Sequence, residues 1–166
     1  IGNATARTLT ARPSDDVSFF FPGKRVWRTA FVGGSYEFLN KGVSLLDARS
    51  YFHFYATGIT PAMTIKMVNK GSQYGVAYMD ANEDALDGGK TYKGHLPPNG
   101  PAKDFWSFVV YDNQTRSMLQ TDQQFPSVSS ARKSTRQNAD GSFDIYFGPT
   151  CPEGKQGNWI QTIPGK

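Results

Sequence analysis

The spacing of apolar side chains predicts one amphipathic helix in the first half of the chain, at about residues 45–57. Apolar residues recur there at steps of three and four, which places them on one helix face: Leu45, Ala48, Phe52, Tyr55 and Ile59. Ser44 and Asp47 have the spacing of a capping box at the start. Gly58 stands where a left-handed C-terminal cap would lie, and Pro61 prevents the helix from continuing. We therefore expect a helix that packs this one apolar face against a hydrophobic core.

Beyond this helix the pattern changes to short extended segments bounded by turn residues, and a short helical turn is expected before it at residues 3–10. The expected strands are 64–68, 73–79, 91–96, 105–112, 143–148 and 158–163. Both faces of segment 105–112 are largely apolar, as in a central strand, whereas Asp144 and Tyr146 give segment 143–148 one wet face. The expected fold class is mainly β, an antiparallel jelly-roll-like β-sandwich with one docked α-helix.

Composition supports a folded domain and weakens two classes of function. The 166 residues, 38% of them hydrophobic and 14% aromatic, suffice for a core, so a disordered chain is excluded. The net charge of +4 is dispersed, and its densest cluster, Arg132, Lys133 and Arg136, lies in a Ser-rich loop. We therefore expect no nucleic-acid partner. No apolar run reaches the length of a membrane span, and the single Cys151 cannot form an internal disulfide.

One segment resembles a cation-binding loop. Asp80, Asn82 and Asp84 alternate as calcium ligands do, but Ala85 occupies the place of the sharp-turn glycine, and Thr91 that of the bidentate glutamate. An acidic hairpin loop is therefore the favoured interpretation, with an opportunistic cation site as the alternative. We expect no resident metal and no cofactor.

Catalytic chemistry has only scattered candidates in this sequence. There is no Gly-x-Ser-x-Gly elbow, and the two histidines that could serve as a base are His53 and His95. If the chain is a hydrolase, the candidate residues are polar groups on or beside the apolar elements: Asp47, Arg49, His53, Arg116 and Asp122. Ordinary helix-face and turn hydrogen bonds are the favoured interpretation of these residues.

Aromatic residues on the expected strands are candidates for stacking against a ligand. Trp106 and Tyr111, both in segment 105–112, could hold a carbohydrate or another small molecule by their ring faces. Their strand spacing also suits core or interface packing, which is the favoured interpretation.

Several sequence blocks closely resemble one bacterial group of proteins. They are WRT at 27–29, FVGGS at 31–35, LLDAR at 45–49, YATGITPAM at 55–63, PAKDFW at 101–106, TRSMLQTD at 115–122 and NADGS at 138–142. The group carries the domains of unknown function 1254 and 1214. The resemblance implies two jelly-roll-like domains that are prone to symmetric assembly. Residues 1–60 would be an inter-domain segment and residues 61–166 most of the 1214 domain, without its C-terminal strands.

The resemblance therefore implies that this chain is a fragment of a bacterial two-domain protein. Its expected partners are further copies of itself or the remainder of its own chain. A periplasmic or secreted location is favoured over a cytoplasmic one. The favoured function is a non-catalytic β-sandwich module for self-assembly or for binding a small molecule or carbohydrate. The alternative is a secreted or periplasmic hydrolase with its site at the junction of two jelly-roll domains, so whether the chain is an enzyme is left open.

Overall fold

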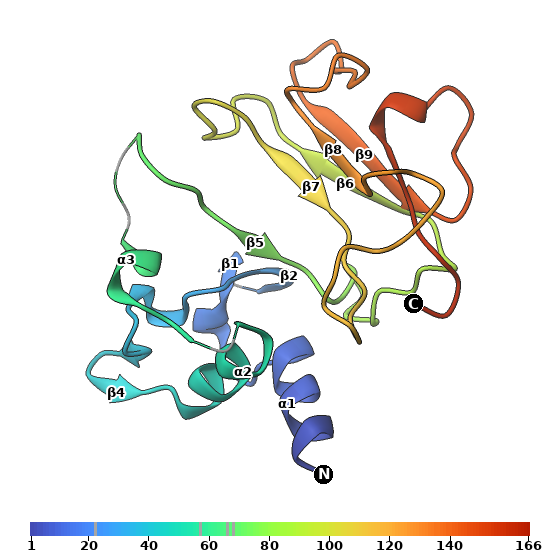
Figure 1. The fold of residues 1–166 in the computed structure, drawn as a ribbon. Coiled ribbons are helices and arrows are strands. Elements are labelled where there is room, and N and C mark those ends of the chain that lie inside the picture. Colours follow the sequence, from blue (N-terminus) through green and yellow to red (C-terminus); the bar gives the residue numbers. More distant parts are fainter. Residues whose placement is uncertain (22, 57, 66, 68) are drawn as a thin grey trace. The chain divides into compact units, whose positions relative to one another are not determined.

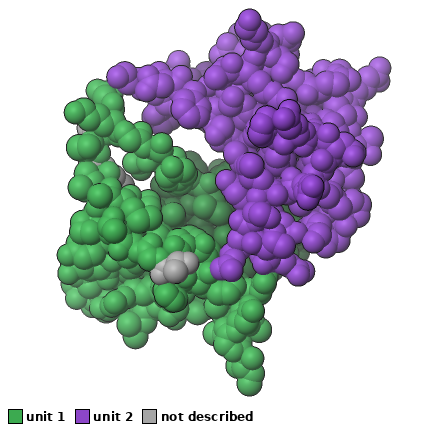
Figure 2. All heavy atoms as spheres, viewed as in Figure 1, with its two compact units in different colours: residues 1–86 green, residues 87–166 purple. Residues whose placement is uncertain are grey.

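The computed structural model describes residues 1–21, 23–56, 58–65, 67 and 69–166. The chain divides into two compact units, Ile1–Leu86 and Asp87–Lys166, which Figure 2 shows in different colours. The described residues form two three-stranded sheets, two two-stranded sheets and three α-helices (Figure 1). The prediction of a mainly β fold is confirmed.

Unit 1 combines a small antiparallel sheet with helices. Its elements are α1 (Gly2–Ala11), β1 (Phe19–Phe21), β2 (Lys24–Thr29), β3 (Leu39–Asn40), β4 (Val43–Ser44), α2 (Leu46–Ala56), α3 (Pro61–Thr64) and β5 (Gly75–Val76), with 3₁₀ turns at Asp16–Ser18 and Val32–Gly34. The strands pair in the order β1-β2-β5, and β3 and β4 form a separate antiparallel pair. The helical turn expected at residues 3–10 is confirmed and belongs to a longer helix, α1.

Helix α2 confirms the predicted helix and its buried stripe. The buried core of unit 1 consists of Val32, Phe38, Ala48, Tyr51 and Phe52, and Leu45, Tyr55 and Ile59 pack against it. The predicted caps are wrong. The helix begins at Leu46, so Leu45 rather than Ser44 precedes it. Gly58 does not have the positive φ of a left-handed cap, and its N–H donates to the carbonyl of Ala56 at 2.8 Å. Thr57 lies outside the described residues.

Strand β2 carries a buried arginine beneath this helix. The guanidinium of Arg28 lies between the rings of Tyr51 and Tyr78, at 4.7 and 4.9 Å from their centroids. Arg28 is 2% exposed, and its Nε and Nη1 have no hydrogen-bond partner among the described residues. Burial raises the pKa of both tyrosines, so they remain neutral rings that stabilise the cation through their faces.

Unit 2 packs two sheets around one core. Its elements are β6 (Tyr92–Leu96), β7 (Ser107–Val109), β8 (Ser127–Ser129), β9 (Phe143–Gly148), a 3₁₀ turn at Gln156–Asn158 and β10 (Trp159–Gln161). One sheet has the order β10-β9-β6, and β7 pairs with β8 in the other. Val128 of β8, Ile145 of β9 and Ile160 of β10 form the buried centre, so both sheets contribute to the same core.

The wet face predicted for segment 143–148 is confirmed. Ile145 is fully buried and Phe143 and Phe147 pack against the core, whereas Asp144 and Tyr146 lie on the opposite face of β9. The expected strands at 91–96 and 158–163 are also confirmed, as β6 and β10.

Three strand predictions are wrong. The sheet is not purely antiparallel, because β10 runs parallel to β9. Segment 105–112 is not a central strand: β7 pairs only with β8 among the described strands, and Phe105 and Tyr111 are 61% and 58% exposed. Thr64 ends helix α3 instead of starting a strand, because Pro61 fits the first turn of a helix. Lys66 and Val68 lie outside the described residues, and segment 73–79 forms only the short β5.

Candidate functional site

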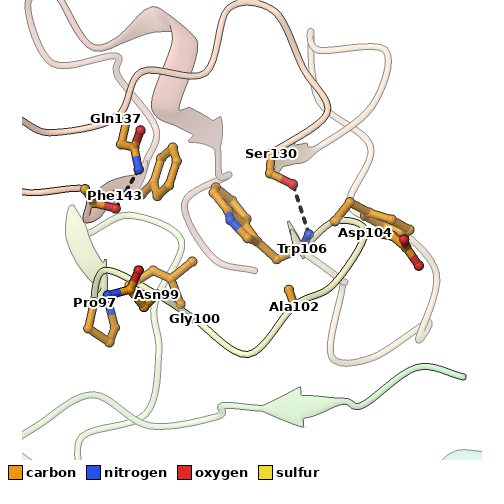
Figure 3. A pocket seen from close by; sticks show the side chains of 12 residues that line it. Pro97, Asn99, Gly100, Ala102, Asp104, Trp106, Ser130, Gln137 and Phe143 are labelled. Atoms are coloured by element: carbon orange, nitrogen blue, oxygen red, sulfur yellow. Dashed lines mark hydrogen bonds between the residues drawn. The ribbon is translucent and has the colours of Figure 1, made fainter. Parts of the chain in front are cut away.

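The larger of the pockets described in unit 2 surrounds Trp106. It has a volume of about 290 Å³ and lies between the loop that follows β6, the segment before β7 and the start of β9 (Figure 3). Trp106 and Phe143 form its aromatic wall, and Asn99, Ser130 and Gln137 supply neutral polar groups. Trp106, a predicted ligand-stacking residue, thus lines a pocket.

The indole of Trp106 is held by aromatic packing and by the backbone. Its ring centroid lies 4.8 Å from that of Phe143 and 5.8 Å from that of Phe108, both in edge-to-face geometry. The Trp106 N–H donates to the Ser130 hydroxyl at 3.1 Å, and the Ser130 N–H donates to the Trp106 carbonyl at 3.0 Å. The position of the half-buried ring is therefore fixed before any ligand arrives.

Two polar groups beside the ring are free to meet a ligand. Among the described residues, no acceptor binds the indole N–H of Trp106, and no partner binds the side-chain amide of Asn99. The amide of Gln137 donates to the carbonyl of Gly141 at 2.7 Å, which holds the far wall. Asp104 supplies the only charged side chain in the lining, and it points away from the indole ring (Figure 3). Close to the ring, the pocket is aromatic and neutral.

The two predicted stacking residues do not act together. Trp106 faces the core side of its segment, whereas Tyr111 lies on the exposed side, where it pairs with Met118 across a β-bridge. Successive side chains of an extended segment point to opposite faces, so Trp106 and Tyr111, five positions apart, lie on different sides. Trp106 therefore remains a candidate for ligand stacking in this pocket, and Tyr111 lies outside it.

The three candidates on helix α2 lie on the solvent side of unit 1. Asp47, Arg49 and His53 are all exposed. The carboxylate of Asp47 accepts a hydrogen bond from the hydroxyl of Ser14 at 3.4 Å. Within the described part of unit 1, no carboxylate lies within hydrogen-bond distance of His53. These residues therefore have the surroundings of a helix surface.

Asp122 and Arg116 organise turns in unit 2. Asp122 accepts a hydrogen bond from the Gln161 side-chain amide at 2.9 Å, and its N–H donates to the same side chain at 3.0 Å. This pair ties the segment before β8 to strand β10. Arg116 has a positive φ of 63° in a turn, where its N–H donates to the Asp112 carbonyl at 2.8 Å.

The calcium-like segment forms a turn held by its own first carboxylate. Oδ1 of Asp80 accepts hydrogen bonds from the N–H groups of Asn82 and Asp84, at 2.8 and 3.1 Å. No group of three His, Cys, Asp or Glu side chains among the described residues has the arrangement of a metal site. Also among these residues, no helix is long and apolar enough to cross a membrane.

The carboxyl group of Asp112 has a strongly lowered pKa. It is 7% exposed and accepts hydrogen bonds from Lys166 Nζ at 2.9 Å and from the N–H groups of Gln114 and Thr115. Chiefly through Lys166, these bonds lower the pKa of Asp112 to about 2. The folded state thus holds the proton more weakly than the unfolded chain, so the carboxylate stabilises unit 2 at neutral pH.

This stabilisation is expected to be present in full above the ordinary carboxyl pKa of about 4, which the unfolded chain has. It is expected to be lost as the pH falls toward the folded-state pKa of about 2. Thermal unfolding of the wild type and of Asp112→Asn, followed from pH 7 to pH 2, checks this. The difference in melting temperature between the two proteins should shrink as the pH falls. A difference that stays constant over this range would contradict the role of the charge.

The sequence did not single out the polar residues of the Trp106 pocket. Asn99, Ser130 and Gln137 lie in connecting segments, where no periodicity marks them. The only local signal is the Asn-Gly pair at Asn99, which is typical of a turn, and Asn99 has a positive φ of 60°. That signal predicts a turn in the backbone and does not indicate that the Asn99 side chain lines a pocket.

Comparisons with known proteins identify a family for this chain without naming an activity. No curated protein matches the chain. Among solved structures, the chain is similar to the crystal structure of the VPA0106 protein from Vibrio parahaemolyticus, with 20% identity and a TM-score of 0.47. The match covers 74% of this chain and 29% of that one, so this chain spans less than a third of its neighbour. Residues 71–166, more than half of the chain, match the family described as "Protein of unknown function (DUF1214)". The resemblance to a 1214 domain is thus confirmed, and the chain belongs to this DUF1214 family.

Proposed function

We propose that unit 2 is a non-catalytic binding module that holds a ring-sized neutral ligand, such as a sugar, against Trp106. The observation that carries this proposal is the half-buried indole in the wall of a pocket of about 290 Å³. Pockets for small molecules start at about 300 Å³, so this one suits a single ring. An aromatic wall covers the apolar face of such a ring, and the neutral groups of Asn99 and Trp106 can bond its hydroxyls.

Binding fits this pocket better than catalysis. Acid–base or nucleophilic catalysis requires a titratable or nucleophilic group beside the reacting atoms. The described lining near the indole ring offers amides and an indole N–H, and the Ser130 hydroxyl already accepts from the backbone of Trp106. These groups orient a ligand without activating it.

Replacing Trp106 by alanine tests this function. Loss of the indole wall is expected to weaken the binding of a monosaccharide at least about tenfold, which corresponds to about 1.4 kcal/mol. The measurement is the shift of unit 2 amide resonances during titration with a panel of neutral hexoses. Tyr111→Ala is the matched control, because it removes an exposed aromatic ring from the other side of the same segment and should bind as the wild type does. The absence of saturable binding to any hexose, or an equal loss in both variants, would contradict the proposal.

We also propose, from the resemblance alone, that the whole protein contains a domain of unknown function 1254 and assembles through jelly-roll-like domains. On this proposal residues 1–60 form an inter-domain segment and residues 61–166 belong to the second domain. Exposed apolar side chains of unit 2 support an interface with a second copy or with the remainder of the chain: Phe105, Tyr111, Met118 and Phe125. A bacterial origin and a periplasmic or secreted location stay predictions.

The hydrolase also stays a prediction, and the described geometry adds no support to it. Its candidate residues on α2 belong to unit 1, and Arg116 and Asp122 belong to unit 2. Each group has its own structural role, as a helix surface or as a turn. The Trp106 pocket contains none of these five residues.

A further inference from the structure

A second, smaller cavity lies in unit 2 beside the outer face of β9. It has a volume of about 70 Å³ and is lined by Arg136, Asp144, Tyr146 and the turn that contains Lys155 and leads into β10. It shares no lining residue with the Trp106 pocket. The function proposed above does not use it.

The charges around this cavity leave an excess of positive charge. Asp144 supplies the only carboxylate in the described lining. That carboxylate already binds His95 Nδ1 at 2.7 Å and lies 3.7 Å from Lys93 Nζ. Among the described residues, neither Arg136 nor Lys155 forms an ion pair with a carboxylate. Arg136 and Lys155 therefore line the cavity as two cations, while the carboxylate of Asp144 is already bound by Lys93 and His95 of strand β6.

The backbone that carries the two cations is held in place. Oδ1 of the buried Asn158 accepts the N–H of Arg136 at 2.7 Å, and its Nδ2 donates to the carbonyls of Arg136 and Asp144 at 2.8 and 2.9 Å. Lys155 Nζ lies over the ring of Tyr146, 5.6 Å from its centroid. Gly157 lies so close to the carbonyl of Ser134 that a β-carbon would overlap it. The guanidinium of Arg136 donates from Nη1 to the carbonyl of Lys133 at 3.2 Å, so each of the two cations has one contact that orients it before a ligand arrives.

We propose that this cavity binds a small tetrahedral oxyanion of the phosphate class through Arg136 and Lys155. A water molecule needs about 10–15 Å³ of such a volume, so the cavity holds roughly five water-sized groups. Phosphate has five non-hydrogen atoms, and its negative charge matches the unpaired cations. The same chemistry describes free phosphate and the phosphoryl group of a larger ligand that extends into solvent.

Titration with inorganic phosphate tests the proposal, with sodium chloride at equal ionic strength as the reference. The amide resonances of Gly154 and Gly157 are expected to shift in a saturable way with phosphate and not with chloride. Arg136→Gln and Lys155→Gln should each weaken the binding at least about fivefold. Arg132→Gln, from the same basic segment but outside the cavity, is the matched control and should bind as the wild type does. The resonance of the core residue Ile145 shows whether each variant is folded.

A second titration, with glycerol phosphate, separates the two sources of the anion. Tighter binding of the ester indicates the phosphoryl group of a larger ligand, and weaker binding of the ester indicates free phosphate. Equal shifts with chloride, or an equal loss in Arg132→Gln, would show a diffuse charge effect and overturn the proposal. Trp106→Ala should leave phosphate binding unchanged, so failure at one site is distinguishable from failure at the other.

Discussion

Replacing Ile145 by alanine is expected to lower the free energy of unfolding of unit 2 by about 2–5 kcal/mol. Ile145 is 0% exposed and lies on β9, the central strand of the β10-β9-β6 sheet. It packs with Val128 and Ile160, which belong to strands of the two different sheets. Removing its side chain beyond Cβ leaves a cavity where the sheets meet, and fixed strands on both sides prevent the space from closing.

Urea unfolding of the wild type and the variant measures this loss. Met118→Ala is the matched control, because it also removes three non-hydrogen atoms, from a side chain that is 50% exposed. Its cost is expected to stay near 0.5 kcal/mol, roughly the scale of surface substitutions. Equal losses in the two variants would show that Ile145 does not hold the sheets together.

The sequence pattern predicted the helices and strands in which buried residues recur at a regular spacing. The steps of three and four in α2 and the alternation in β9 each describe one buried face, and both faces are buried in the structure. Tyr51 was missed because it lies beside the predicted stripe, where the sheet of unit 1 widens the buried surface. A period identifies the centre of a buried face better than its edges.

Features that depend on contacts between distant segments could not be predicted in this way. Strand β10 runs parallel to β9 because the chain between them returns through the turn Gln156–Asn158, in which Asn158 bonds Arg136 and Asp144 of other segments. The Trp106 pocket is similar, since Asn99 comes from the connection between β6 and β7, whereas Ser130 and Gln137 come from the connection between β8 and β9. The sequence therefore indicated the stacking residue, and only the fold brings its polar neighbours to it.

Gly33→Ala is expected to destabilise unit 1 by about 2–5 kcal/mol, the sum of two separate costs. Gly33 has a φ of 79°, a left-handed conformation that costs an L-residue about 1–2 kcal/mol. In addition, a β-carbon at Gly33 would overlap the carbonyl oxygen of Leu39. This oxygen belongs to the backbone of β3, so relief requires a shift of the chain next to the buried Val32 and Phe38.

The adjacent glycine separates these two costs. Gly34 has a φ of 67°, and a β-carbon there would meet no atom within 4 Å. Gly34→Ala is therefore expected to cost only about 1–2 kcal/mol, the strain of the left-handed backbone. Urea unfolding of both variants gives the difference, which reports the contact with Leu39 alone. Equal losses would mean that the chain around β3 moves aside freely, and the close approach of Gly33 to β3 would then contribute nothing to the core of unit 1.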